Sequence, residues 1–174
     1  MRGMRIWIFR TTDVDSKVLN HLQENLAMVF CGTVESGRTF ELKEKELNAA
    51  RGQYKSTPIL WRLRILKPTQ DFLLAVTEAD LYADGLNFVF GEAYLAARCA
   101  IISLARLKAG YPGKPFTAEL FLRRALTEAV HEVGHLLGIG HCPQPTCVMH
   151  FSNSLYDTDR KGPTFCSRCQ EFLP

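Results

Sequence analysis

The chain has 174 residues, the size of one ordinary domain, and its 47% hydrophobic and 10% aromatic content is that of a globular protein with a core. The net charge is only +3, and Lys and Arg are spread along the chain, which argues against a nucleic-acid partner. No run approaches the ~20 apolar residues that a membrane-spanning helix needs. The N-terminal segment also lacks the apolar core of a secretory signal, so we expect a cytoplasmic protein without a membrane partner.

The first half of the chain alternates short apolar runs with helical patterns. Ser16 can cap the first helix, and Thr57-Pro58 places proline at the first position of the second. We expect a strand over 4–9, a helix over 16–30, a strand over 33–42 with a turn at 36–37, and a helix over 57–66. The polar stretch 41–55 predicts no clear element.

The second half contains three apolar runs of strand length, at 72–77, 87–90 and 99–104. Thr117 can then cap a long helix that runs to about Leu137 with an apolar stripe. Strands that alternate with helices predict an α/β sandwich with a mostly parallel sheet. After residue 141 the sequence shows no periodicity, so this tail must pack on the main domain or be held by a metal.

Residues 131–141 read His-Glu-Val-Gly-His-Leu-Leu-Gly-Ile-Gly-His. His131 and His135 are four residues apart, so a helix places both imidazoles on one face, where they can share one Zn²⁺. Glu132 is rotated off that face. It can accept a hydrogen bond from a metal-bound water, which is where a general base is needed.

Gly138 predicts the end of this helix, because glycine adopts the left-handed conformation at little cost. The chain can then bend back and bring His141 to the same metal as a third ligand. Three nitrogen ligands leave a fourth position open for water, as is typical of catalytic zinc. The alternative, in which the histidines are ordinary polar residues, does not explain why the helix, Gly138 and His141 all agree.

This pattern is the signature of the metzincins, and residues 147–149 resemble the Met-turn that lies below the zinc in that clan. Met149 taken alone would more often be a core residue. Many metzincins place a tyrosine two residues after this methionine. Here that residue is Phe151, which has no hydroxyl to bind the metal or stabilise an oxyanion. His150 and Tyr156 are the nearby polar candidates.

Six cysteines are present, and four of them cluster near the C-terminus in C-x4-C and C-x2-C pairs: Cys142, Cys147, Cys166 and Cys169. Four thiolates can hold one tetrahedral zinc with no open position, which predicts a structural metal. Two disulfides are the main alternative, and an iron–sulfur cluster is a further one. Cys31 and Cys99 remain, and we expect both to be small buried apolar residues.

Together these residues resemble the archaemetzincin family, which joins the long zinc motif to four cysteines, the first directly after the third histidine. The similarity covers 131–169 and extends upstream through 79–82 and 85–91. It implies an α/β (α+β) metzincin-like zincin fold, with a twisted five-stranded mixed sheet, an active-site helix and a small zinc-pinned C-terminal subdomain. We expect residues 1–141 to form the catalytic subdomain and 142–174 to carry the Met-turn and the cysteine site.

The resemblance also implies that residues 87–93 form the edge of the sheet above the zinc. The substrate-binding residues would be Asn87, Phe88, Val89, Phe90 and Gly91. An extended peptide can add to such an edge by β-augmentation. The alternative, that 87–90 is simply a core strand, agrees equally well with the sequence.

The sequence thus predicts a zinc-dependent peptidase of the metzincin type, a hydrolase in which Glu132 acts as general base on a water held by His131, His135 and His141. Met149 and Gly138 would support the site, and short peptides cleaved from the N-terminus are a candidate substrate class. Two zinc ions are expected, one catalytic and one structural, in a monomer whose partners are peptides or proteins. The alternative is a metal-containing peptide-binding protein with little or tightly gated turnover.

Overall fold

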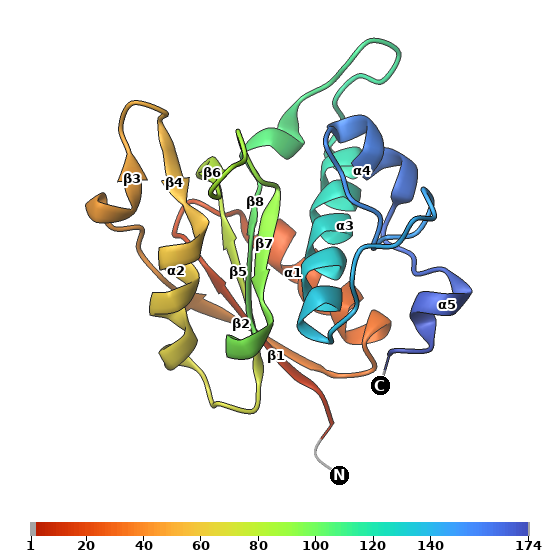
Figure 1. Cartoon of the computed structure of the whole chain (residues 1–174), viewed down its shortest axis with the longest axis horizontal. Helices are drawn as coiled ribbons and strands as arrows, with labels where there is room; N and C mark the ends of the chain where they lie inside the picture. Colours follow the sequence, from red (N-terminus) through yellow and green to blue (C-terminus); the bar gives the residue numbers. More distant parts are fainter. Residues whose placement is uncertain (1–2, 174) are drawn as a thin grey trace.

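The computed structural model describes residues 3–173, and its centre is a five-stranded sheet in the order β2-β1-β5-β8-β7 (Figure 1). Four strands are parallel, and the edge strand β7 runs antiparallel to β8. The sheet is therefore mixed and mostly parallel, as expected. The strands are β1 (Arg5–Arg10), β2 (Thr33–Thr39), β5 (Phe72–Thr77), β7 (Gly91–Tyr94) and β8 (Cys99–Ser103).

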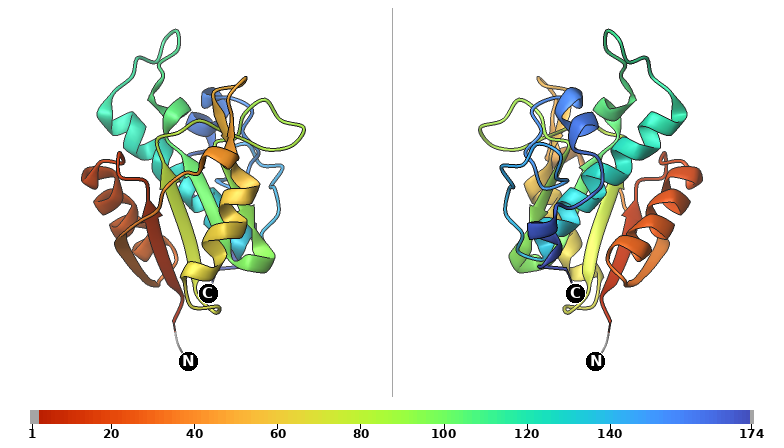
Figure 2. Two further views of the ribbon diagram at one scale, coloured as in Figure 1. Left: turned by 90° about the vertical axis from the view of Figure 1, so that its left-hand side faces the viewer. Right: turned by 90° about the vertical axis from the view of Figure 1, so that its right-hand side faces the viewer.

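Alternation along the central strands divides the core into two layers. In β5, Phe72, Leu74 and Val76 face one layer. Leu73 and Ala75 face the other. Helices α1 (Ser16–Val29) and α3 (Ala118–Leu136) cover the first face, and α2 (Ser56–Leu63) covers the second (Figure 2). A strand buried on both faces reads as a continuous apolar run, which is why β5 is so easily found in the sequence.

The helices begin close to the predicted positions. Asp15 caps α1 by accepting a hydrogen bond from the Lys17 amide at 2.7 Å, so the expected cap, Ser16, is instead the first helical residue. Helix α2 starts at Ser56 and continues into one turn of 3-10 helix, η2 (Arg64–Leu66), so it spans the predicted range.

Helix α3 is capped by Thr117, whose hydroxyl accepts from the Leu120 amide at 3.1 Å, as predicted. It is buried on almost every side over its second half, because the sheet covers one side and the C-terminal segment covers the other. That segment contributes Val148, Met149 and Phe165 to the first core layer. The structure therefore shows the tail packed on the main domain, one of the two expectations for it.

A second, three-stranded sheet accounts for the polar stretch that the sequence left unassigned. Its order is β3-β4-β6, with a tight turn at 49–52 between the first two strands. It lies beside the main sheet, above α2 in Figure 1. Its elements are η1 (Glu44–Glu46), β3 (Leu47–Asn48), β4 (Gln53–Lys55) and β6 (Leu81–Tyr82).

The strand predicted at 87–90 was wrong. Residues 83–90 form a loop in which only Val89 pairs, through an isolated bridge to Leu81. The aromatic residues of the run pack on each other instead, with the rings of Phe88 and Phe90 edge-to-face at 5.1 Å. The edge strand begins at Gly91, directly after this run and four residues later than expected.

Two smaller expectations also need correction. Strand β2 runs through 36–37 without a turn, because Gly37 at φ +108° takes up a shift in register against β1. Cys31 is exposed rather than buried, because it follows α1 in a left-handed conformation (φ 47°); Cys99 is buried as expected.

The C-terminal segment lies along the side of α3 that faces away from the sheet (Figure 1). Within residues 3–173 no helix combines the length and the apolarity needed to cross a membrane. The remaining elements are η3 (Leu95–Ala97), η4 (Ala105–Lys108), α4 (Leu155–Lys161) and α5 (Ser167–Gln170).

Candidate metal centre and cleft

Helix α3 brings the first two histidines together at its C-terminal end. The Nε2 atoms of His131 and His135 are 3.1 Å apart. The helix then stops, and Gly138 at φ +84° turns the chain so that His141 returns to the same point. The centre of the His141 ring lies 4.8 Å from the centre of the His135 ring and 5.4 Å from the centre of the His131 ring. The structure therefore gathers the three predicted ligands.

Backbone carbonyls orient two of these rings. The Val148 carbonyl lies 2.7 Å from Nδ1 of His131, and the Ile139 carbonyl lies 2.8 Å from Nδ1 of His135. A carbonyl can only accept a hydrogen bond, so each Nδ1 carries the proton and each Nε2 presents a lone pair. Both lone pairs point to the position where the three rings converge.

The donor set fits zinc. Zn–N bonds of about 2.0–2.1 Å in a tetrahedral site separate two nitrogens by roughly 3.3–3.4 Å, close to the 3.1 Å seen between His131 and His135. Burial lowers the pKa of all three histidines, which favours the neutral imidazole that a metal requires. Three nitrogens also leave room for a further ligand from the cleft.

Glu132 is buried beside this cluster and lines the cleft in front of it. Burial raises the pKa of its carboxyl well above the ordinary value, and the nearby charge of Glu128 adds to the effect. A carboxylate with a raised pKa is a better proton acceptor, which suits a general base.

Two charged residues of the cleft escaped the sequence analysis. Lys161, at the end of α4, has a fully buried side chain whose Nζ lies 3.3 Å from both His131 Nδ1 and Glu128 Oε1. Glu128 also accepts from the Thr158 hydroxyl at 2.9 Å. A lysine in a polar, aperiodic segment gives no sequence signal, whereas Glu128 could have been noticed one helical turn before Glu132.

Met149 is fully buried directly beneath the histidine helix. A Cβ added at Gly134 would lie only 2.5 Å from its sulfur, so the first glycine of the motif makes room for the methionine. Phe151 packs edge-on against His141 at 5.0 Å and is 42% exposed in the cleft. The position after the Met-turn is therefore next to the metal site, and it carries no hydroxyl.

The polar candidates suggested for this position lie elsewhere. His150 faces the Cys142 carbonyl at 2.9 Å, and Tyr156 is mostly exposed on α4; neither lines the cleft. Ser152 and Asn153 do line it, directly after Phe151.

The four clustered cysteines form a second group whose sulfur atoms lie within 4.8 Å of one another. The Cys142 and Cys166 sulfurs are 3.9 Å apart, close to the roughly 3.8 Å that Zn–S bonds of about 2.3 Å give in a tetrahedron. None of the four forms a disulfide. The backbone N–H of Cys169 lowers the pKa of the Cys166 thiol to about 7, which favours the thiolate that binds metal.

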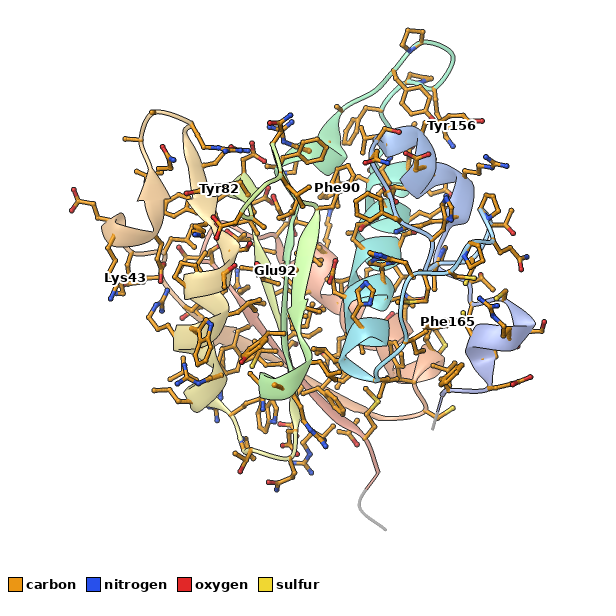
Figure 3. The ribbon with its side chains drawn as sticks, viewed as in Figure 1. Lys43, Tyr82, Phe90, Glu92, Tyr156 and Phe165 are labelled. Atoms are coloured by element: carbon orange, nitrogen blue, oxygen red, sulfur yellow. The ribbon has the colours of Figure 1, made fainter. Side chains whose placement is uncertain are left out.

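A cleft of about 730 Å³ opens in front of the histidines. Its opposite wall is formed by the edge strand β7 and the loop before it, and it includes every residue predicted to bind substrate: Asn87, Phe88, Val89, Phe90 and Gly91. Figure 3 shows Glu92 on the side of β7 that faces α2, where Ser56 and Thr57 donate to its carboxylate. Ala93, the next residue of the strand, packs against the core layer that contains α3.

Comparison with known proteins agrees with this arrangement. The model of Peptidase family M54 matches residues 12–174. The chain belongs to that family. The archaemetzincin of Methanocaldococcus jannaschii is 44% identical over 170 residues, which cover 98% of this chain and 93% of that protein. The chain is thus similar to archaemetzincins along its whole length, and its family is one of zinc metallopeptidases.

Solved structures give the same result for the fold. The crystal structure of the Methanopyrus kandleri archaemetzincin has a TM-score of 0.85 and 39% identity, covering 98% of this chain and 93% of that one. A zinc-dependent peptidase from Methanocorpusculum labreanum has a TM-score of 0.88 and 30% identity, covering 97% and 100%. The expected metzincin-like architecture is confirmed.

Proposed function

We propose that His131, His135 and His141 hold the catalytic zinc of this peptidase and that Glu132 is its general base. The observation that carries the proposal is the convergence of three imidazoles, two of them oriented by backbone carbonyls, with a buried carboxylate beside them at the floor of an open cleft. Zinc, when bound there, polarises the scissile carbonyl and acidifies a water molecule. Glu132 takes the proton of the attacking water and passes it to the leaving amine.

The edge strand is proposed to hold the substrate. Strand β7 pairs on one side with β8 and ends the sheet on the other, and residues of this strand line the cleft. An extended peptide can add to it through backbone hydrogen bonds, so that its scissile bond lies over the histidines. The five residues from Asn87 to Gly91 are its proposed contacts.

The cysteine group is proposed to hold a second, structural zinc, which brings the total to two ions. Four sulfurs leave no position for substrate, and the group joins segments that share little other regular structure. We accordingly divide the chain into a catalytic subdomain, 1–141, and a C-terminal subdomain, 142–174. We also propose a cytoplasmic monomer, because a reducing compartment keeps these thiols available for metal.

Cleavage of a peptide library by the zinc-loaded protein tests the catalytic assignment. Glu132→Ala should abolish cleavage while zinc content, measured by mass spectrometry, stays unchanged. Glu119→Ala makes the same chemical change at an exposed position of α3 and should keep full activity. The cleavage products will show whether the enzyme trims short peptides from the N-terminus or cuts internally.

Phe151 favours one alternative, a metal-containing peptide-binding protein with little or gated turnover, because the hydroxyl found here in many metzincins is missing. Zinc-loaded protein that retains peptides without Glu132-dependent cleavage would replace the peptidase proposal by this one.

A further inference from the structure

The loop 83–90 that precedes β7 forms part of the cleft wall, and side chains from outside the cleft hold it in place. Leu86, Asn87 and Phe88 line the cleft. The loop's own backbone bonds are few: the Leu86 amide to Ala83, the Val89 amide to Leu81, and the Phe90 carbonyl to Ser103. None of them uses the carbonyls of Leu86 or Asn87.

Arg51 binds those two carbonyls. Its Nη2 donates to the Leu86 oxygen at 3.0 Å and to the Asn87 oxygen at 2.6 Å. Its Nε donates to Gln53 Oε1 at 2.7 Å, and the guanidinium lies 4.2 Å from the centre of the Tyr82 ring. The planar, multiply bonded group is fixed on three sides, as only arginine allows.

Gln53 donates to one of the same two carbonyls. It is 4% exposed, and its Nε2 donates to the Asn87 oxygen at 3.1 Å and to Asp80 Oδ2 at 3.0 Å. Asp80 in turn accepts two hydrogen bonds of 2.8 Å from Arg106, whose guanidinium lies 4.3 Å from the Phe88 ring. The network therefore reaches the loop at both its backbone and its aromatic side chain.

The second sheet carries the residues of this network that bind the loop. Arg51 lies in the turn between β3 and β4, and Gln53 begins β4. Figure 3 places Tyr82 between this hairpin and Phe90. Arg51 itself is exposed, and exposed polar contacts add little to global stability, so its contacts matter locally, at the loop.

We infer that Arg51, backed by Gln53, is a positioning residue for substrate: it fixes the backbone of Leu86 and Asn87 so that the cleft wall is already formed before a peptide binds. The inference rests on the proposed peptidase function. It predicts an effect on peptide binding and none on the chemistry, because Arg51 touches neither the histidines nor Glu132.

The test compares zinc-loaded Arg51→Ala and Arg51→Lys with the parent. Without the hydrogen bonds of Arg51 to the loop (the clamp), a peptide must order the loop as it binds. KM for a library-derived peptide should then rise about tenfold, while kcat changes less than about twofold. Lysine keeps the charge but cannot bridge two carbonyls and Gln53, so it should behave like alanine. Arg64→Ala is the matched control, because Arg64 also lies over an aromatic ring, that of Trp61 at 4.3 Å, and donates to a carbonyl away from the cleft.

Two readouts do not depend on turnover. Hydrogen exchange of the amides of 84–90 should accelerate in Arg51→Ala but not in Arg64→Ala. The inhibition constant or Kd of the tripeptide hydroxamate Pro-Leu-Gly-NHOH should rise about tenfold, while that of acetohydroxamate, which reports on the metal alone, should stay within about twofold.

Faster exchange with unchanged peptide affinity would overturn the inference, as would a loss of kcat at constant KM or full function in Arg51→Lys. If the parent cleaves no peptide, the exchange and hydroxamate measurements still decide the role of Arg51. Failure of the peptidase proposal is thus distinguishable from failure of the clamp.

Discussion

At the scale of single residues, the position of Glu132, the proposed general base, depends on the absence of a side chain across the cleft. Gly91 opens the edge strand, and its Cα faces Glu132. A Cβ added there would lie 2.6 Å from Glu132 Cγ and 2.7 Å from its Oε1. The added Cβ would also lie 2.8 Å from the Ile101 carbonyl, which belongs to the backbone of β8 and yields less readily than a side chain. Glu132 is the group that would have to move.

Gly91→Ala should therefore lower kcat by about 100-fold, because a displacement of about 1 Å is costly for a proton acceptor. Zinc content should be unchanged, since the histidines are not touched. Steady-state kinetics on a library-derived peptide and metal analysis check this, with Gly3→Ala, whose added methyl meets nothing within 4 Å, as the control. A Gly91→Ala enzyme with normal kcat would show that Glu132 has more freedom than the contacts indicate.

At the scale of elements, α3 and α4 are joined by a buried ion pair. Arg124 on α3 is fully buried and donates twice to Asp159 on α4, at 2.8 Å each, and also to the Leu107 and Ala109 carbonyls. Burial by itself would raise the pKa of Asp159, but hydrogen bonds from Arg124 and Tyr111 outweigh it and hold the pKa below its ordinary value.

Asp159→Asn should lower the free energy of unfolding by about 3–5 kcal/mol, because it leaves the Arg124 charge buried without a partner. The double variant Arg124→Met, Asp159→Leu should recover most of that loss, and urea denaturation of the zinc-loaded proteins measures both. Since the folded-state pKa of Asp159 is depressed, its contribution is fully present well above the unfolded pKa of 3.8 and is lost as pH falls from there through the lower folded-state pKa. Parent and Asp159→Asn should then converge in stability; equal stability at pH 7 would contradict the argument.

Elements with a strong period were predictable, and contacts between distant segments were not. The apolar run of β5 predicts its strand, and the apolar stripe of α3 predicts the helix that carries the first two histidines. The glycine after α3 predicts the turn that returns the third histidine. All three features are local in sequence. The prediction of a strand at 87–90 was wrong, because periodicity alone does not distinguish a short apolar strand from a loop whose aromatic side chains are packed. Lys161 and Arg51 contact partners 30 or more residues away, which no local pattern encodes.

At the scale of the whole molecule, the cysteine group brings together distant parts of the C-terminal segment, and its first member, Cys142, directly follows His141. Cys166→Ser should reduce zinc content by about one ion per chain and lower the melting temperature, because the ion's binding energy contributes to folding. Cys31→Ser, at an exposed cysteine outside the group, should change neither. Elemental analysis and thermal unfolding check both variants, and full zinc content in Cys166→Ser would argue against a four-cysteine site.

The two proposed metal sites share one short stretch of chain. Cys142 follows His141, its amide donates to the Met149 carbonyl at 2.9 Å, and the Val148 carbonyl orients His131. Thermodynamic reciprocity requires that any increase in affinity that one ion confers on the other site is returned by the same factor. We expect the shared stretch to make each ion raise the affinity of the other site, so at limiting zinc the chains should separate into fully loaded and empty populations with few singly loaded ones. Cellular zinc supply would then change the number of active molecules rather than the activity of each.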